Sequence, residues 1–529
     1  MLIPEGMIDY LIIGAGPAGL QLGYYLEKHG KNYVILESGD VAGSFFKTHP
    51  RHGKLISINK VYTGYSDKEI NLRWDWNSLL TEDDDECSFT SFSKRYFPAA
   101  ENMVDYLGAY AEKFSLNIKY NSAVTSVERS ESEFLIKTAS ENIYRARRVI
   151  VATGVSKPWI PNIDGIESAT NYCDMDTNPD IYKNKKVLIL GKGNSAFETG
   201  DSLVETAAVI HLCSPNSLKM AWSTHYVGHL RAVNNNLLDT YQLKSQNAIL
   251  DADVESIKKN GEQFSVTFKY RHAEDEVETL TYDHVIVCTG FRFDSSIFNE
   301  SCKPTLCARN KFPAQNPNWE SVNVPGLYFA GTITQYLDYK KFMSGFIHGF
   351  RYNVRTLFNL LMCKYEEKEL PQVKLPVIAE VLAADIIDRV NQASSLWQQP
   401  GFLCDAYVRS GEGIVCYKDL PVDYIKTEPL FAKREMYVLT LEFGQQKFDN
   451  PFAVARIARD NAKQAEDSNF LHPVIRHMNA NALLSEHHII EDLSAEWKEP
   501  EHIVPLVAYL HKAVNNNISN VKTEALEAV

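Results

Sequence analysis

The sequence predicts an α/β protein with two Rossmann-like dinucleotide-binding domains, the first split by the second, and an additional α+β C-terminal region. Three observations predict this fold. Two glycine-rich turns, at residues 14–19 and 191–196, each join an apolar strand to a helical pattern. Two later strands end in the similar tripeptides 152–154 and 288–290. After residue 376 the sequence contains neither a glycine-rich turn of this kind nor such a tripeptide.

The composition is that of a large globular protein with no affinity for polyanions. Of 529 residues, 45% are hydrophobic and 23% are charged, which allows a sizeable core. The formal net charge of −13 argues against nucleic acid as a partner, because such surfaces need an excess of Lys and Arg. A small-molecule substrate is therefore the better expectation.

The N-terminal stretch and the cysteines predict a cytoplasmic protein without a membrane span. The apolar run from Tyr10 to Ile13 is too short for a signal peptide or a spanning helix. Nine scattered cysteines without a C-x-x-C pair favour reduced thiols over disulfides or zinc. His487, His488, Glu491 and Asp492 have helical spacing, which favours a solvated helix face over a metal site.

The first glycine turn predicts a nucleotide site because it has the required context. The strand expected over 9–13 runs into the turn, and helical spacing follows from Leu20. Gly14 permits the tight turn, Gly16 lets a pyrophosphate approach the backbone, and Gly19 lets the helix pack on the strand. A second strand over 33–36 ends at Glu37, about 20 residues beyond the turn, where a carboxylate binds ribose hydroxyls.

The second glycine turn repeats the pattern, with Ala196 at the third glycine position. The strand expected over 208–212 ends at Cys213 and Ser214, where an NAD-selecting acid would stand. Without a carboxylate to repel a 2′-phosphate, NADPH is favoured over NADH. The residues that could contact this phosphate are Ser214, Lys219, His225 and Arg231.

Short segments of the chain resemble the flavin-containing monooxygenases over roughly residues 8–360. Residues 42–46 resemble that family's flavin-proximal G-G-x-W turn, with Phe45 in the aromatic place. Residues 56–59 resemble its segment ending in an asparagine that touches flavin and nicotinamide, and 96–98 with 106–107 fit its F-P and Y-L stretch. The order and spacing of these matches, together with two glycine turns, identify the class.

Longer blocks resemble the FAD-dependent oxidoreductase domain-containing flavoproteins of the endoplasmic reticulum. They are residues 50–60, 75–80, 224–228, 238–245, 345–352 and 468–475. The chain shows neither a signal peptide nor a K-D-E-L-like ending, so a place in the endoplasmic reticulum is not expected to carry over.

The resemblance implies a division into domains and a set of cofactor contacts. Residues 1–160 and 284–362 would form the FAD-binding domain, 161–283 the NADPH-binding domain, and 377–529 a C-terminal extension that covers the active site. Asn59 would be the catalytic residue, forming a hydrogen bond near flavin N5. The expected cofactor-binding residues are Gly14, Gly16, Pro17, Ala18, Gly19, Glu37, Ser38, Ser44, Phe45, Ser57, Asn59, Val124, Thr153, Gly154, Gly191, Gly193, Asn194, Ser195, Ala196, Ser214, Lys219, Gly331 and Thr332.

The resemblance implies an FAD enzyme that consumes NADPH and molecular oxygen. In this hypothesis a flavin C4a-hydroperoxide oxygenates a small nucleophilic substrate: an amine, an amino acid or a sulfur compound. One departure stands against it, since the family's F-x-G-x-x-x-H fingerprint is absent from residues 164–172. A homodimer is the expected oligomer.

Two alternatives stay open. One is an NADPH-dependent reductase or oxidase that passes electrons to a disulfide, a quinone or oxygen. A dithiol relay is disfavoured, because Cys302 and Cys307 are the only near-neighbour cysteines. The other is a flavin-stabilised binding protein whose C-terminal region recognises a partner.

Overall fold

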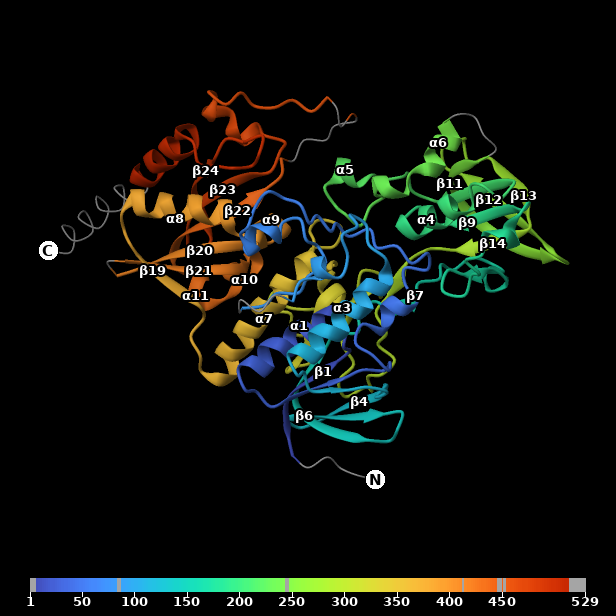
Figure 1. Cartoon of the computed structure of the whole chain (residues 1–529), viewed down its shortest axis with the longest axis horizontal. Helices are drawn as coiled ribbons and strands as arrows, with labels where there is room; N and C mark the ends of the chain where they lie inside the picture. The colour runs from blue at the N-terminus through green and yellow to red at the C-terminus, as the bar shows by residue number, and fades with distance from the viewer. Residues whose placement is uncertain are drawn as a thin grey trace.

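The computed structural model describes residues 6–82, 87–242, 247–411, 413–444, 450 and 453–512, and it contains three large sheets. Figure 1 shows the N-terminal sheet at the bottom, the second sheet at the right and the C-terminal sheet at the left. The predicted fold class, two Rossmann-like domains with an extra α+β region, is confirmed.

The first sheet is mixed, and both segments of the split first domain contribute strands to it. Its order is β3-β2-β1-β6-β5-β4, and β18 joins β6 in parallel. The bounds are β1 Ile8–Ile13, β2 Tyr33–Leu36, β3 Ile118–Lys119, β4 Val124–Ser130, β5 Glu133–Thr138, β6 Ile143–Val151 and β18 Leu327–Phe329. The strands of β1, β2 and the end of β6 are apolar and buried, as expected for parallel strands covered on both faces.

The second sheet has the order β13-β12-β11-β10-β9-β14-β8. The bounds are β8 Thr170–Asn171, β9 Lys186–Leu190, β10 Val209–Ser214, β11 Ala248–Asn260, β12 Gln263–Tyr270, β13 Val277–Tyr282 and β14 His284–Val287. The expected boundary at residue 284 differs from this topology, because β14 pairs with β9 and β8. The second unit therefore extends to Val287, and the crossover follows it.

The C-terminal sheet has the order β19-β21-β20-β22-β23-β24. The bounds are β19 Gln372–Pro376, β20 Leu403–Ser410, β21 Gly413–Pro421, β22 Glu435–Glu442, β23 His472–Asn479 and β24 Ala482–His488. β19 belongs to this sheet, so the C-terminal region begins before the expected boundary at residue 377. His487 and His488 lie on a strand, so the predicted helical spacing with Glu491 and Asp492 is wrong.

Helices cover the sheets and join the first domain to the C-terminal region. The longer ones are α1 Pro17–Lys28, α3 Ala100–Lys113, α4 Asn194–Leu203, α7 Ile347–Glu366 and α8 Ala379–Gln392. The short ones are α2 Lys68–Asn71, α5 Ala221–Thr224, α6 Asn236–Gln242, α9 Ser394–Gln398, α10 Val422–Thr427 and α11 Pro429–Ala432. In the described part of the chain, no helix combines the length and apolar character needed to cross a bilayer.

The C-terminal sheet packs against a hydrophobic core on each of its two faces. Ala406 and Val408 of β20 join the core that contains α1 and α7, whereas Tyr407 faces the core that contains α8. Successive side chains of a strand point to opposite faces, which explains the division. The first domain and the C-terminal region therefore share one continuous core, and Figure 1 shows α7 beside this sheet.

Candidate active site

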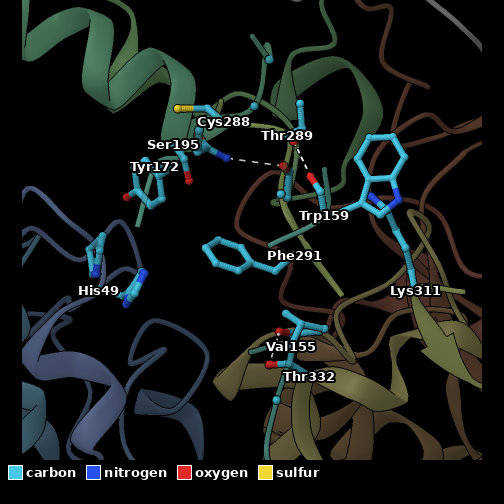
Figure 2. A pocket seen from close by; sticks show the side chains of 18 of the residues that line it. His49, Val155, Trp159, Tyr172, Ser195, Cys288, Thr289, Phe291, Lys311 and Thr332 are labelled. Atoms are coloured by element: carbon cyan, nitrogen blue, oxygen red, sulfur yellow. Dashed lines mark hydrogen bonds between the residues drawn. The ribbon is translucent and has the colours of Figure 1, made fainter. Parts of the chain in front are cut away.

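A cavity of about 1420 Å³ lies where the first and second nucleotide-binding units meet. It exceeds the roughly 300–1,000 Å³ of a pocket for one drug-sized ligand, so it can hold more than one. Figure 2 shows His49 and Tyr172 on one side, Trp159 and Lys311 on the other, and Phe291 projecting between them. Thr332 and Val155 lie below Phe291 in this view.

The first glycine turn has the geometry of a pyrophosphate site. Gly14 has a φ of +107° and a Cβ there would lie 2.8 Å from the carbonyl oxygen of Ala152, while a Cβ on Gly19 would lie 1.9 Å from that of Gly14. Both glycines are required by close backbone packing. Gly16 lines the cavity and has no atom within 4 Å of its missing Cβ. As the N-cap of α1 it makes no side-chain cap, so the helix N–H groups are free for an anion.

The second glycine turn repeats this arrangement in the other unit. Gly191 has a φ of +134°, and a Cβ there would lie 2.3 Å from the carbonyl oxygen of Cys288. Gly193 lines the cavity, has open space at its missing Cβ, and caps α4 without a side-chain hydrogen bond. Two uncapped helix N-termini therefore face one cavity, as two dinucleotides require.

The strand ends and the start of α7 form the cavity floor. Thr153 and Gly154 follow β6, and Gly331 and Thr332 follow β18. Gly331 has a φ of +77°, and a Cβ there would lie 2.7 Å from that of Ala18. α7 begins beside them and has no side-chain cap, so its N-terminus is a third uncapped helix end at the cavity.

Glu37 stands at the end of β2, as predicted, and its carboxylate is enclosed by donors. Its Oε2 accepts the N–H of Ala15 at 2.7 Å. Its Oε1 accepts the N–H of Gly39 at 2.7 Å and the hydroxyls of Ser44 at 2.9 Å and Ser38 at 3.3 Å. This carboxylate therefore fixes the first turn against the flavin-proximal segment.

The residues considered for the 2′-phosphate lie apart. Ser214 lines the cavity at the end of β10, and Lys192 donates to its carbonyl oxygen at 3.2 Å while pairing with Asp251. His225 packs its ring against Phe443, 4.1 Å away, and does not line the cavity. Sequence reasoning alone could not separate these placements.

Asn59 is the one predicted catalytic residue, and the structure gives it a different contact. Its side chain is buried and donates to the carbonyl oxygens of Ser93 at 2.8 Å and Arg95 at 3.1 Å. It does not line the cavity, whereas Ser57 does. Its Oδ1 is buried without a hydrogen-bond partner among the described residues, and its expected contact with the flavin stays a prediction.

An aromatic wall with one cation lines the cavity. The rings of Trp76 and His348 stack with centroids 4.2 Å apart, and Phe346 stacks on the other side of His348 at 5.8 Å. The guanidinium of Arg231 lies 5.2 Å from the Trp76 ring. Burial, reinforced by Arg351 and Arg231, lowers the pKa of His348 well below its ordinary value, so this imidazole is neutral.

A buried carboxyl lies on the opposite wall. Glu198 of α4 lines the cavity, and its Oε2 accepts the hydroxyl of Tyr172 at 3.5 Å. Its Oε1 is buried without a partner among the described residues. Burial raises the pKa of Glu198 to about 7, and the charge of Asp201 adds to this, while Tyr172 and Lys54 oppose it.

The structure brings most predicted cofactor residues to the cavity. Those that line it are Gly16, Pro17, Ala18, Phe45, Ser57, Thr153, Gly154, Gly191, Gly193, Asn194, Ser195, Ser214, Gly331 and Thr332. Those that do not are Gly14, Gly19, Glu37, Ser38, Ser44, Asn59, Val124, Ala196 and Lys219. Among the described residues after 376 none lines the cavity, and the expectation that this region covers the site stays a prediction.

Several lining residues were not predicted. Trp159, Phe291, Lys311 and the ring of His348 come from segments without a motif. Phe291 directly follows the second crossover tripeptide, and this position was the only signal that could have indicated it.

The chain matches the pyridine nucleotide-disulphide oxidoreductase family over residues 11–331, which span both glycine turns and both crossovers. The chain belongs to this family. It is also 34% identical to the FAD-dependent oxidoreductase domain-containing protein 2 of Mus musculus, over 98% of this chain and 85% of the relative. The resemblance predicted from the longer sequence blocks is thereby confirmed.

Two solved structures share the fold of this oxidoreductase. A flavin-containing monooxygenase from Stenotrophomonas maltophilia has a TM-score of 0.50 and 19% identity, covering 68% of this chain and 99% of its own. The ornithine N-hydroxylase of Kutzneria sp. 744, with reduced FAD, NADP⁺ and L-ornithine, has a TM-score of 0.51 and 15% identity, covering 68% and 100%. At these identities the likeness shows the fold alone.

The predictions of a flavin-dependent oxidoreductase and of FAD and NADPH as its cofactors are confirmed by the family to which the chain belongs. The residues that line the cavity fit both cofactors. Gly16 and Gly193 leave open space beside uncapped helices, and the cavity joins the two turns. FAD would lie against α1, Thr153 and Gly331, and NADPH against α4.

Proposed function

We propose that this protein is an NADPH-consuming, FAD-dependent monooxygenase that oxygenates a small nucleophilic substrate, such as an amine, an amino acid or a sulfur compound. One observation carries the proposal. The two nucleotide turns, the start of α7 and an aromatic wall open into a single cavity, and the two cysteines that line it, Cys213 and Cys288, cannot pair with each other.

The cavity thiols are held apart by the sheet. Cys213 lies on β10 and Cys288 follows β14, with β9 between these strands. Two strand spacings amount to roughly 9–10 Å, which exceeds the Cα separation that a disulfide permits. Burial raises the pKa of Cys213 to about 12 and that of Cys288 further, so both thiols are protonated at neutral pH.

The near-neighbour cysteines in the sequence do not supply a relay either. Cys302 is buried, and its Sγ donates to the carbonyl oxygen of Val127 at 3.1 Å. Cys307 donates to that of Phe312 at 3.3 Å, and burial raises its pKa to about 11. Neither lines the cavity. A small acceptor such as oxygen is therefore favoured over a disulfide acceptor.

The chain's residues bind, orient and exclude water in this scheme. FAD, when bound, supplies the ring that takes a hydride from the nicotinamide and passes electrons on. The helix N-termini at Gly16 and Gly193 would hold the two pyrophosphates and so orient both cofactors in one cavity. Trp76, Phe346 and neutral His348 provide a wall with little water, and Arg231 offers a cation to a substrate carboxylate.

An NADPH-dependent reductase or oxidase is the second candidate function. The observation that favours it is the absent F-x-G-x-x-x-H fingerprint: Ile166–Ser168 and Thr170–Asn171 form a short 3₁₀ turn and strand there instead. Cytoplasmic location and a homodimer stay predictions.

The ratio of hydrogen peroxide formed to NADPH consumed distinguishes the two functions. The holoenzyme would be supplied with NADPH and oxygen, alone and with a panel of amines, amino acids and thiols. A monooxygenase gives less peroxide and an oxygenated product when its substrate is added. One peroxide per NADPH with every compound, and no oxygenated product, would contradict the proposal.

A further inference from the structure

Two loops of the first domain bring three cationic side chains to one wall of the cavity. Arg309 and Lys311 lie on the hairpin between β16 (Leu306–Cys307) and β17 (Phe312–Pro313). Lys340 lies in the loop after the 3₁₀ helix η6 (Gly331–Tyr336). Figure 2 shows Lys311 at the side of the cavity that Trp159 borders, opposite His49.

Aromatic contacts fix this cationic wall, defined by Arg309, Lys311 and Lys340. The ammonium of Lys311 lies 4.7 Å from the centre of the Trp159 ring, and that of Lys340 lies 5.3 Å from the centre of the Tyr339 ring. The Tyr339 ring packs against Phe312 at 5.2 Å, which joins the two loops. Cation–π contacts hold the charges in place without neutralising them.

The cationic wall has no acidic partner among the described residues, where none of its three side chains forms an ion pair. Asp253 also lines the cavity, but Arg271 already binds it at 2.7 Å and 2.9 Å. Burial lowers the pKa of Lys311, and the charges of Lys340 and Arg309 lower it further. Like charges without an acidic partner repel each other, and a bound anion would stabilise them at the cavity.

The backbone beneath the cations is strained. Ala308, Arg309 and Asn310 have φ values of 50°, 60° and 61°, and Lys340 has 59°. Left-handed φ is uncommon for residues other than glycine, Asn and Asp, and it persists at functional sites where surrounding contacts enforce it. Two of the three cationic residues, Arg309 and Lys340, therefore have a left-handed backbone conformation.

The wall lines the same cavity as the end of β10, where the adenosine ribose of a dinucleotide would lie. Ser214 lines the cavity at this end and begins the loop that carries Lys219. Burial lowers the pKa of Lys340, and the positive charges of Lys219 and Arg309 lower it further. Asp251 at the same end is already occupied by Lys192.

We propose that Arg309, Lys311 and Lys340 clamp the 2′-phosphate of NADPH, so that loops of the first domain select the nucleotide bound by the second. The inference rests on the proposed function for its use of NADPH. A phosphate carries more charge and more acceptor oxygens than a ribose hydroxyl, so the clamp discriminates NADPH from NADH. Because the clamp lies in one domain and the nucleotide turn in the other, the selection of NADPH also depends on how closely the two domains approach each other.

Titration of the oxidised holoenzyme with NADP⁺ and with NAD⁺ tests the clamp. The variants are K311A, K340A and R309A, with K341A as the matched control, because Lys341 is an exposed neighbour that does not line the cavity. Each clamp variant should weaken NADP⁺ binding by about tenfold or more and leave NAD⁺ binding within about twofold. Added salt should weaken NADP⁺ binding more in the wild type than in the variants.

Equal losses of NADP⁺ and NAD⁺ affinity, or no loss in any variant, would overturn the proposal. FAD content and melting temperature establish that each variant is folded, and K311Q and K340Q replace any alanine variant that is not. Binding to the oxidised enzyme involves no oxygen chemistry. A failure of the monooxygenase proposal would therefore leave this result intact, and the two outcomes can be told apart.

Discussion

The side-chain amide of Gln399 donates a hydrogen bond to the hydroxyl of Ser344 at 3.1 Å, and both residues are completely buried. The same amide donates to Asn353 at 2.9 Å, and its oxygen accepts the N–H of Met343 at 3.2 Å. The C-terminal region thus holds the segment that leads into α7 at the cavity. This contact explains how a region whose described residues do not line the cavity can still affect it.

Replacing Gln399 by leucine should therefore loosen the flavin site. Q399L leaves the Met343 N–H and the Asn353 oxygen without partners, at a cost of about 1–3 kcal/mol for each buried group. We expect a lower melting temperature and a faster loss of FAD on dilution, measured by flavin fluorescence. The exposed contact of Gln392 with Asp388 offers the control Q392L, which should change neither property. Retention of FAD in Q399L at the wild-type level would show that this contact is not needed.

Valine at either open glycine should remove one cofactor and leave the fold intact. Neither Gly16 nor Gly193 has an atom within 4 Å of its missing Cβ, so the apoprotein tolerates a side chain there. G193V should keep FAD and lose reduction by NADPH, whereas G16V should lose FAD. Alanine at Gly19, whose Cβ would lie 1.9 Å from the Gly14 carbonyl oxygen, should instead prevent folding. Flavin content and circular dichroism separate these outcomes, and NADPH reduction of G193V would contradict the second site.

The pKa of Glu198, which burial raises to about 7, predicts a pH-dependent stability. Its ordinary value is 4.5, so between these pKa values the folded state keeps a proton that the unfolded state has lost. Stability therefore falls as pH rises through this window and stays lower above it. E198Q should be more stable than wild type at about pH 8 by up to roughly 3 kcal/mol, with a much smaller difference at about pH 5. Urea unfolding at both pH values measures this, and a constant difference would refute it.

Arg351 should be one of the most sensitive positions outside the nucleotide turns. Its guanidinium is fully buried and donates to the carbonyl oxygens of Asp75 at 2.9 Å, Ser78 at 2.7 Å and Leu72 at 2.7 Å. R351M leaves the carbonyl oxygens of Asp75 and Ser78 unpaired, whereas that of Leu72 still accepts the side-chain amide of Gln398 at 3.1 Å. The loss should be on the order of 1–3 kcal/mol per unpaired acceptor. Denaturant unfolding would measure the loss. The exposed Arg145 pair with Glu133 provides the control R145M, which should cost less than about 1 kcal/mol.

Local sequence signals predicted the nucleotide-binding half of the fold well. The turns at Gly14 and Gly191 depend on glycines only a few residues apart and on adjacent strands, so a short window contains the whole pattern. The strand over 33–36 followed from an apolar run directly before Glu37.

The rest of the site arises from contacts between distant segments. Trp76 and His348 stack although about 270 residues separate them, and the cationic wall combines two loops without a motif. Asn59 was assigned from a short resemblance, yet its amide satisfies two carbonyl oxygens of a neighbouring loop. The C-terminal sheet has no sequence motif with a mechanism, so its support of α7 could be found only from the packing.

Anaerobic mixing of the holoenzyme with NADPH tests the central claim most directly, namely that one cavity brings NADPH to FAD. The visible flavin absorbance would be followed by stopped flow at increasing NADPH, with NADH as the comparison. We predict complete bleaching of the bound FAD at saturating NADPH, and a weaker apparent affinity for NADH. Bound FAD that stays oxidised in the presence of excess NADPH would contradict this account and would favour a flavin-stabilised binding protein.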